Sequence, residues 1–194
     1  MQRLNLCFPM SCLLLIALLL SSCNGGNVQA THIEIPSLKP FRLTSPAFTD
    51  GSTIPSLYTC DSTNISPELR WNDSFSNAAS YALLMDDPDV PTQPWVHWLV
   101  YNIPATDTLL PGHFRMDSVV NGIKQGFTSF KITGYAGPCP PNGVHRYYFK
   151  LYALDAKLNL PARLTKSQLL NAMKGHILAE ADLMGKYARK KNNQ

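Results

Sequence analysis

In residues 80–87, a row of large hydrophobic residues at every second position ends in an acid. Tyr81, Leu83 and Met85 are followed at this spacing by Asp87. Because residues i and i+2 of a strand share a face, the pattern predicts a strand whose core-facing row ends in a carboxylate. Pro88 favours an extended Asp87, since a residue before proline avoids the helical region.

Residues 95–101 follow a proline-rich stretch and are apolar on both faces. Strict alternation places on one face Trp95, His97, Leu99 and Tyr101, and on the other Val96, Trp98 and Val100. Two apolar faces are typical of a central strand. His97 then lies half-buried beside Trp95. An acid within reach would fix its tautomer and raise its pKa, and we expect Asp87 to be that acid.

A further strand is predicted from residue 145 onward. His145, Tyr147, Phe149 and Leu151 share one face, so the first two can line a site while the other two enter the core. Arg146 points the other way, and we expect it to pair with an acid or a carbonyl oxygen.

The remaining chain predicts turns and one helix. Residues 41–55 indicate a strand, a turn at Asp50-Gly51 and a second extended piece. Residues 116–132 are expected to meander over the surface. A capping box from Thr165 to Gln168 predicts a helix start. Three- and four-residue spacing extends that helix through Leu169, Met173, Ile177, Ala181 and Met184. The predicted fold class is therefore mainly β with a C-terminal helix.

Composition fits one compact domain, and charge excludes one class of partner. The chain has 194 residues, with 15 prolines and 11 glycines that argue against long helices. The formal net charge of +4 depends on Lys186, Arg189, Lys190 and Lys191. A basic tail without a basic face gives little support for nucleic-acid binding, so no nucleic-acid partner is expected. The tail is either a solvated terminus or weakly attracted to anionic lipid.

The first 22 residues are predicted to be a lipoprotein signal peptide. Arg3 precedes the apolar run CLLLIALLL, which is too short to span a bilayer with margin. The sequence Leu20-Ser21-Ser22-Cys23 resembles a bacterial lipobox, which implies cleavage before Cys23 and lipidation of its sulfur. An ordinary signal peptide or membrane anchor is the alternative.

Under the lipoprotein interpretation, residues 23–40 form a lipidated tether, residues 41–189 the domain and residues 190–194 a basic tail. The expected location is the envelope, facing the periplasm from the outer membrane if the host has two membranes.

Two cysteines, Cys60 and Cys139, fall within the predicted domain. In an exported protein such a pair predicts one disulfide. Two buried free thiols are the alternative, because a bridge needs Cα atoms within about 7 Å and the sequence does not give their separation.

Two segments, DPDVPTQPWVHW and GPCPPNGVHRYYF, resemble the signature segments of the phosphatidylethanolamine-binding protein family, also called Raf kinase inhibitor proteins. The resemblance is to the bacterial and archaeal branch and spans nearly all of the predicted domain. It implies an antiparallel central sheet, a smaller sheet and a pocket for a small anion or phosphorylated head group. The pocket residues carried over by motif are Asp87, Trp95, His97, Gly137, Cys139, Pro140, Pro141, His145 and Tyr147.

Three functions follow as hypotheses. The resemblance implies a non-enzymatic envelope protein that binds a small anion or phosphorylated head group and needs no cofactor or metal. Inhibition of an envelope protease or another protein partner is the second, since some family members inhibit kinases or serine proteases. An enzyme is the third, because Asp87 and His97 resemble two thirds of a hydrolase triad. The sequence has no G-x-S-x-G elbow. A metal site from Asp87, His97 and His145 matches no standard motif.

Overall fold

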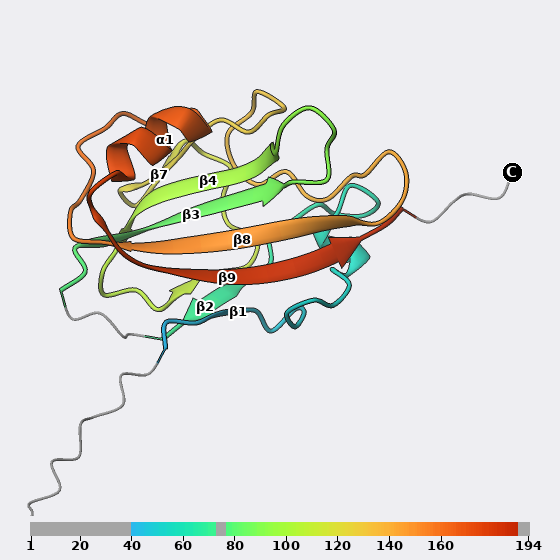
Figure 1. The fold of residues 1–194 in the computed structure, drawn as a ribbon, viewed down its shortest axis with the longest axis horizontal. Coiled ribbons are helices and arrows are strands. Elements are labelled where there is room, and N and C mark those ends of the chain that lie inside the picture. The colour runs from blue at the N-terminus through green and yellow to red at the C-terminus, as the bar shows by residue number, and fades with distance from the viewer. Residues whose placement is uncertain (1–39, 73–76, 190–194) are drawn as a thin grey trace, which may run out of the picture. The chain divides into compact units, whose positions relative to one another are not determined.

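A computed structural model describes residues 40–72 and 77–189. The predicted signal peptide, Cys23 and the last five residues lie outside the described residues. The described chain forms two antiparallel sheets with one α-helix, which confirms the mainly β prediction (Figure 1). That helix is α1 (Lys166–Met173), and no helix of the described chain is long and apolar enough to cross a membrane.

The larger sheet has six strands in the order β6-β7-β4-β3-β8-β9. Their bounds are β6 (Val119–Val120), β7 (Ile123–Gln125), β4 (Trp95–Pro104), β3 (Ser80–Asp87), β8 (His145–Leu154) and β9 (Ile177–Tyr187). The smaller sheet has the order β1-β2-β5, with β1 (Leu43–Thr44), β2 (Leu69–Trp71) and β5 (Leu109–Leu110). A short 3-10 helix, η1 (Ser56–Tyr58), follows β1.

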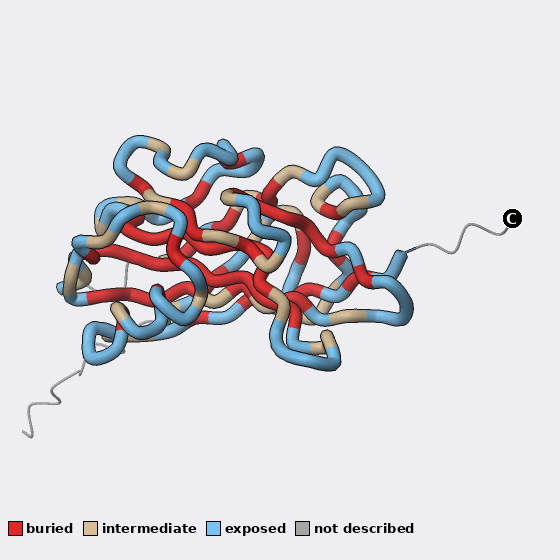
Figure 2. The backbone as a smooth tube through the Cα atoms, turned by 90° about the horizontal axis from the view of Figure 1, so that it is seen from above, coloured by how far each residue is buried: buried red, intermediate tan, exposed pale blue. Residues whose placement is uncertain are grey.

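Each face of the six-stranded sheet covers its own hydrophobic core. On one face, here the sandwich face, Tyr81 and Met85 of β3 pack with Leu69 and Trp71 of the smaller sheet. On the other, here the helix face, Leu84 of β3 packs in one cluster with Leu169 and Met173 of α1. Every residue of β3 is buried, as Figure 2 shows for the middle of the sheet. The predicted central position of β4 is confirmed, because strands flank it on both sides.

Strand β4 departs from the strict alternation that the sequence predicted. Met85 of β3 pairs with Trp98, but the next residue, Asp86, pairs with Val96, so β4 carries one extra residue, His97. This β-bulge places His97 and Trp98 on the same face, where His97 packs on Tyr147 and Trp98 joins the sandwich-face core. The prediction that His97 shares a face with Leu99 and Tyr101 is therefore wrong, since those two residues belong to the helix-face core.

A second bulge follows at Asn102. Leu83 pairs with Val100 and Tyr81 with Ile103, so β4 again advances by one extra residue. Asn102 has φ of 58°, a left-handed conformation that asparagine tolerates better than most residues. Its side chain is satisfied in the helix-face core, where it exchanges two hydrogen bonds of 2.9 Å with Leu158.

The C-terminal segment is helical only at its start. Thr165 caps α1 through the predicted capping box with Gln168. The helix ends at Met173, and Gly175 has φ of +84°, which glycine adopts without strain. The predicted helix through Ile177, Ala181 and Met184 is wrong, because these residues lie in β9, where alternate positions are buried from Ala181 to Tyr187.

Residues 116–132 do more than meander, since residues 119–125 add the β6–β7 hairpin to the edge of the large sheet. Gln125 of β7 is fully buried, which no surface meander would require. The predicted turn at Asp50-Gly51 is present, and Gly51 has φ of +75°.

Candidate functional site

Three strands bring acidic, imidazole and phenol side chains to one end of the sandwich face. Asp87 ends β3, His97 lies near the start of β4, and His145 and Tyr147 open β8. We call these four residues the histidine cluster. His145 Nδ1 lies 2.7 Å from Asp87 Oδ2, and the second carboxylate oxygen accepts the backbone N–H of Asp89 at 2.8 Å. Both oxygens of Asp87 are therefore engaged before any ligand arrives.

His97 has a different partner from the one expected. Its Nδ1 lies 2.5 Å from the carbonyl oxygen of Ala136, and the backbone N–H of Ala136 donates in return to the carbonyl of His97 at 3.0 Å. Asp87 thus orients His145 and not His97, which corrects the sequence-based assignment. Burial lowers the pKa of His97, and the Ala136 carbonyl and Asp87 only partly oppose that effect, so the expected raised pKa is also wrong.

Tyr147 connects the two histidines. Its ring meets the His97 ring edge-on, with centroids 5.1 Å apart. Its hydroxyl is buried and makes no hydrogen bond of standard geometry within the described part of the chain, although the Asp87 carboxylate and the Cys139 backbone are near enough to act on it. Burial, reinforced by Asp87, raises the pKa of Tyr147. An unsatisfied buried hydroxyl is uncommon and calls for an explanation.

Trp95 lies at the rim of the cluster and reveals a residue that the sequence reasoning missed. Its ring meets Phe130 edge-on at 5.4 Å, and Phe130 also contacts His97 at 5.7 Å. Phe130 is 46% exposed, so it forms an open aromatic wall beside a buried imidazole. No periodicity in its loop could have predicted this contact, because it joins residues that only the fold brings together.

The loop of residues 137–141 is held against the segment after η1. The disulfide between Cys60 and Cys139 is present, with a Cα–Cα distance of 5.4 Å. Gly137 donates its N–H to Asn64 Oδ1 at 2.9 Å, and Cys60 donates its N–H to the Pro138 carbonyl at 3.1 Å. A Cβ on Gly137 would lie 2.4 Å from Asn64 Oδ1 and from the Tyr58 carbonyl, so packing alone requires glycine here.

The other predicted loop residues differ in exposure. Pro140 is buried, whereas Pro141 and Cys139 are exposed. Cys139 serves the disulfide, so its sulfur is not a free ligand-binding thiol. Whether the loop touches a ligand remains a prediction.

The predicted structural role of Arg146 is confirmed. Its Nη2 donates to Asp89 Oδ1 at 2.6 Å, its Nε to Asp89 Oδ2 at 3.0 Å, and its backbone N–H to the same oxygen at 2.8 Å. These bonds, led by the side-chain pair, lower the pKa of Asp89. Asp87 and Asp89 thus bind two successive residues of β8 and fix the β3–β4 turn to that strand.

The histidine cluster is nearly closed to solvent. The side chain of Asp87 is 3% exposed and that of His145 is 12% exposed. His97 is 3% exposed and Tyr147 is fully buried. His145 is therefore the member of the cluster most open to solvent. Among the described residues, no three histidine, cysteine or acidic side chains are arranged to hold a metal ion.

The proton positions determine what the cluster can bind. The carbonyl of Ala136 can only accept, so Nδ1 of His97 carries a hydrogen and Nε2 of the neutral ring is an acceptor. His145 likewise directs Nδ1 toward an acceptor, the Asp87 carboxylate. Either ring can donate through Nε2 only when it is protonated.

Known proteins match this sequence and this fold. The family model described as phosphatidylethanolamine-binding protein matches residues 44–188, so the chain belongs to the phosphatidylethanolamine-binding protein family. A UPF0098 protein of Methanothermobacter thermautotrophicus is 47% identical over 148 residues, which cover 76% of this chain and 98% of that protein. A UPF0098 protein of Aquifex aeolicus is 43% identical, with 75% and 86% of the two chains covered.

Two solved structures are similar as well. A crystal structure of a phosphatidylethanolamine-binding protein homologue from Chlamydia trachomatis has a TM-score of 0.71 and 41% identity, covering 77% of this chain and 98% of that one. Escherichia coli YbcL, described as a member of the mammalian family, has a TM-score of 0.73 and 32% identity, covering 78% and 100%.

Proposed function

We propose that the protein binds a small oxyanion, free or as a phosphorylated head group, in the histidine cluster. The observation that carries the proposal is the Tyr147 hydroxyl, a buried donor without a hydrogen-bond partner of standard geometry among the described residues. Leaving such a group unpaired costs roughly 1–3 kcal/mol, which a ligand oxygen would recover. The neighbouring histidines supply further donors when they are protonated.

Binding of an anion is coupled to uptake of a proton. The buried His97, whose pKa burial lowers, presents an acceptor at Nε2 while its ring is neutral. An anionic oxygen would be repelled by this lone pair. Either a ring takes up a proton, or the ligand arrives protonated, as phosphate monoesters partly do near their second pKa of about 6. Affinity therefore rises as pH falls below neutrality.

We propose binding in preference to catalysis. In the part of the chain that the structure describes, no serine or threonine hydroxyl hydrogen-bonds His97 or His145, so neither ring has a nucleophile to activate. Both Asp87 oxygens hold other groups in place, which suits a positioning role.

An envelope location is proposed with it. The lipobox-like sequence before Cys23 supports lipid anchoring, and the Cys60–Cys139 disulfide favours an oxidising compartment. Globomycin treatment of cells tests the anchor. Accumulation of the unprocessed precursor is expected, and its absence would contradict lipoprotein processing.

Tyr147→Phe is the decisive variant for anion binding. Removing a buried hydroxyl that makes no hydrogen bond of standard geometry should leave the unliganded protein as stable as before or more stable, by up to about 1 kcal/mol in chemical denaturation. Calorimetry with phosphate, phosphoethanolamine and phosphotyrosine should show affinity reduced about tenfold, the equivalent of 1.4 kcal/mol. Repeating the titration in two buffers of different ionisation enthalpy measures proton uptake.

Tyr152→Phe is the matched control, since Tyr152 lies on the same strand but in the helix-face core. Unchanged anion affinity in Tyr147→Phe would rule out the proposed donor, and no heat with any of the three ligands would reject the proposed function.

A further inference from the structure

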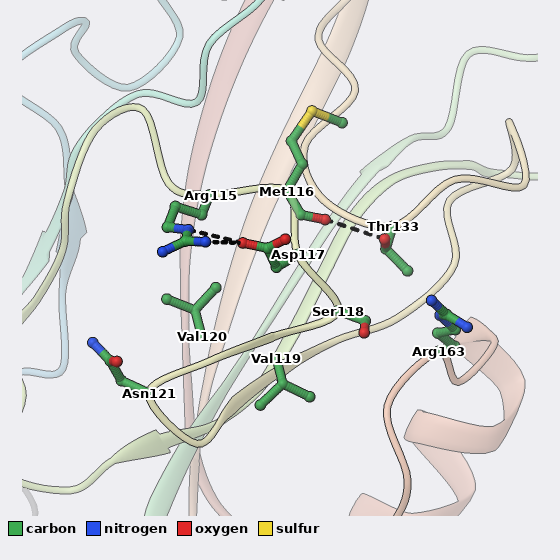
Figure 3. Close-up of a pocket in the computed structure, with 9 residues that line it drawn as sticks. All are labelled: Arg115, Met116, Asp117, Ser118, Val119, Val120, Asn121, Thr133 and Arg163. Atoms are coloured by element: carbon green, nitrogen blue, oxygen red, sulfur yellow. Dashed lines mark hydrogen bonds and ion pairs between the residues drawn. The ribbon is translucent and has the colours of Figure 1, made fainter.

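A second hollow, separate from the histidine cluster, lies beside the β6–β7 hairpin. It has a volume of about 520 Å³, and none of the four cluster residues lines it. Figure 3 shows Arg115 and Arg163 on opposite sides of this hollow, with Ser118 and Thr133 between them. We call it the arginine hollow. It exceeds what a bare inorganic ion fills, and it falls within the roughly 300–1,000 Å³ usual for organic ligands.

The buried side-chain amide of Gln125 holds one wall of this hollow in place. Gln125 is fully buried and accepts the Trp98 indole N–H at 2.7 Å. Its side-chain nitrogen donates to the carbonyls of Arg115 at 2.7 Å and of Asp117 at 2.6 Å. The carbonyl of Ser118 accepts the backbone N–H of Gln125 at 2.8 Å, and that of Met116 accepts the Thr133 hydroxyl at 3.2 Å. Four successive carbonyls are thus held in place.

The N–H groups of these same peptides remain available. The backbone N–H groups of residues 116–118 make no hydrogen bond within residues 40–72 and 77–189. Successive free N–H groups attract anions. Residues 116–118 line the hollow, so their N–H groups lie beside it.

Arg163 adds a cation that the fold holds in an unusual conformation. Its φ is 69°, in the left-handed region that non-glycine residues seldom occupy, and its N–H donates to the Gln125 carbonyl at 2.8 Å. Its guanidinium has no ion-pair partner among the described side chains. Such a backbone outlier beside a polar hollow points to a function for the side chain.

Arg115 supplies a second, exchangeable cation. It pairs with Asp117 at 2.7 Å, but both side chains are more than half exposed, at 76% and 54%. Exposed pairs contribute little, typically about 0–1 kcal/mol, so a ligand can compete for either partner. The Ser118 hydroxyl and the Asn121 amide also line the hollow without side-chain hydrogen bonds to the described chain.

We infer that the arginine hollow binds a hydroxylated organic oxyanion, that is, a sugar phosphate or an acidic sugar. The oxyanion pairs with Arg163 and the free backbone N–H groups, while Asn121 and Asp117 receive the hydroxyl groups. The mixture of donors and acceptors favours a polar ligand, and the volume leaves room for more than a phosphate group.

The test uses nuclear magnetic resonance on residues 40–194, since the solved Chlamydia relative consists almost entirely of this domain. The probes are glucose 6-phosphate, glucuronate, glucose and inorganic phosphate. The two hydroxylated anions should shift the amides of residues 116–121 and bind more tightly than glucose or phosphate. Arg163→Gln should weaken them about tenfold, since a charge-assisted hydrogen bond contributes about 1.5–3 kcal/mol.

Matched variants separate this site from the histidine cluster. Arg70→Gln removes another exposed arginine from a surface pair and should change nothing. Tyr147→Phe should leave the shifts at residues 116–121 intact, so this hollow can bind even if the cluster does not. No shift at these amides up to roughly 10 mM probe, beyond the range of weak specific ligands near 1 mM, would overturn the inference. An unchanged affinity in Arg163→Gln, or equal binding of glucose, would overturn it as well.

Discussion

Asp87 Oδ2 lies 2.7 Å from His145 Nδ1, across 58 residues of sequence. The bond joins the end of β3 to the start of β8, two strands that are neighbours in the sheet. It fixes the orientation of the His145 ring at the point where the histidine cluster opens to solvent.

Asp87→Asn should weaken anion binding without unfolding the protein. An amide of the same shape can still accept from the Asp89 N–H through its oxygen, but its NH₂ group cannot accept the Nδ1–H of His145. We expect anion affinity to fall about tenfold, as loss of roughly 1.4 kcal/mol implies. Imidazole nitrogen resonances should show that the proton on His145 Nδ1 is no longer held there.

The control for this variant is Asp89→Asn. It disturbs the bidentate pair with Arg146 on the exposed side of β8 but leaves the Asp87–His145 bond. Anion affinity should stay near the wild-type value. Retention of the proton on His145 Nδ1 in Asp87→Asn would contradict the orienting role.

His97 should make the protein less stable in mild acid. Burial lowers its pKa in the folded state below the unfolded value of 6.5. Between these two values the unfolded chain binds more protons, so stability is complete above pH 6.5 and decreases as pH falls below it. Urea unfolding at about pH 7.5 and 5.5 should show a smaller loss in His97→Gln than in wild type.

His176→Gln is the comparison for that experiment, because His176 is 46% exposed and pairs with Asp155 at the surface. It should keep the wild-type loss of stability. If His97→Gln loses as much as wild type on acidification, the buried imidazole is not the cause.

The disulfide should contribute substantially to stability. Cys60 and Cys139 are 79 residues apart, and closing a long loop restricts the unfolded chain. Cys60→Ser with Cys139→Ser should lower the free energy of unfolding by about 2–4 kcal/mol in urea denaturation. Wild type treated with dithiothreitol should match the double variant, and an effect under about 0.5 kcal/mol would show that hydrogen bonds alone secure the loop.

Gly137→Ala should damage both the loop and the site. The added methyl would meet Asn64 Oδ1 and the Tyr58 carbonyl at 2.4 Å, and such overpacking costs about 1–3 kcal/mol. Because Ala136 binds His97, displacement of this loop should also reduce anion affinity. Thermal unfolding and calorimetry measure the two effects.

Gly143→Ala provides the contrast. Gly143 has φ of +67° but open space around its position, so alanine there costs only the left-handed conformation, about 1 kcal/mol. Anion affinity should not change. Equal losses of affinity in both variants would contradict a specific role for Gly137.

Local patterns predicted the strands that keep their alternation. β3 and β8 have regular pairing from Ser80 to Asp86, so the row ending in Asp87 and the row containing His145 and Tyr147 were read correctly. β4 was assigned the wrong faces, because its bulges depend on pairing with β3 and leave no mark in the apolar pattern. β9 was taken for helix because apolar residues at three- and four-residue spacing also satisfy part of an alternating row.

The residue types of the site were predicted from the sequence, but their hydrogen-bond partners were not. The sequence placed acid, imidazole and phenol at strand ends, yet it could not show which histidine Asp87 contacts. That choice follows from strand order: β8 pairs directly with β3 through Asp86, so His145 comes within reach. Phe130 was not predicted as a site residue, because its contacts with Trp95 and His97 form only after folding.

Because β4 carries one extra residue at its first bulge, the position of the His97 imidazole depends on the number of residues between Trp95 and Trp98. Deleting one residue between Trp95 and Trp98 would restore regular pleating and leave no surplus residue at the bulge. The imidazole could then remain in the chain and still be lost from its neighbours, either turned through the sheet toward α1 or replaced at its place by another side chain. For any relative of this protein, the number of residues separating these two tryptophan positions is therefore as informative as the presence of the histidine.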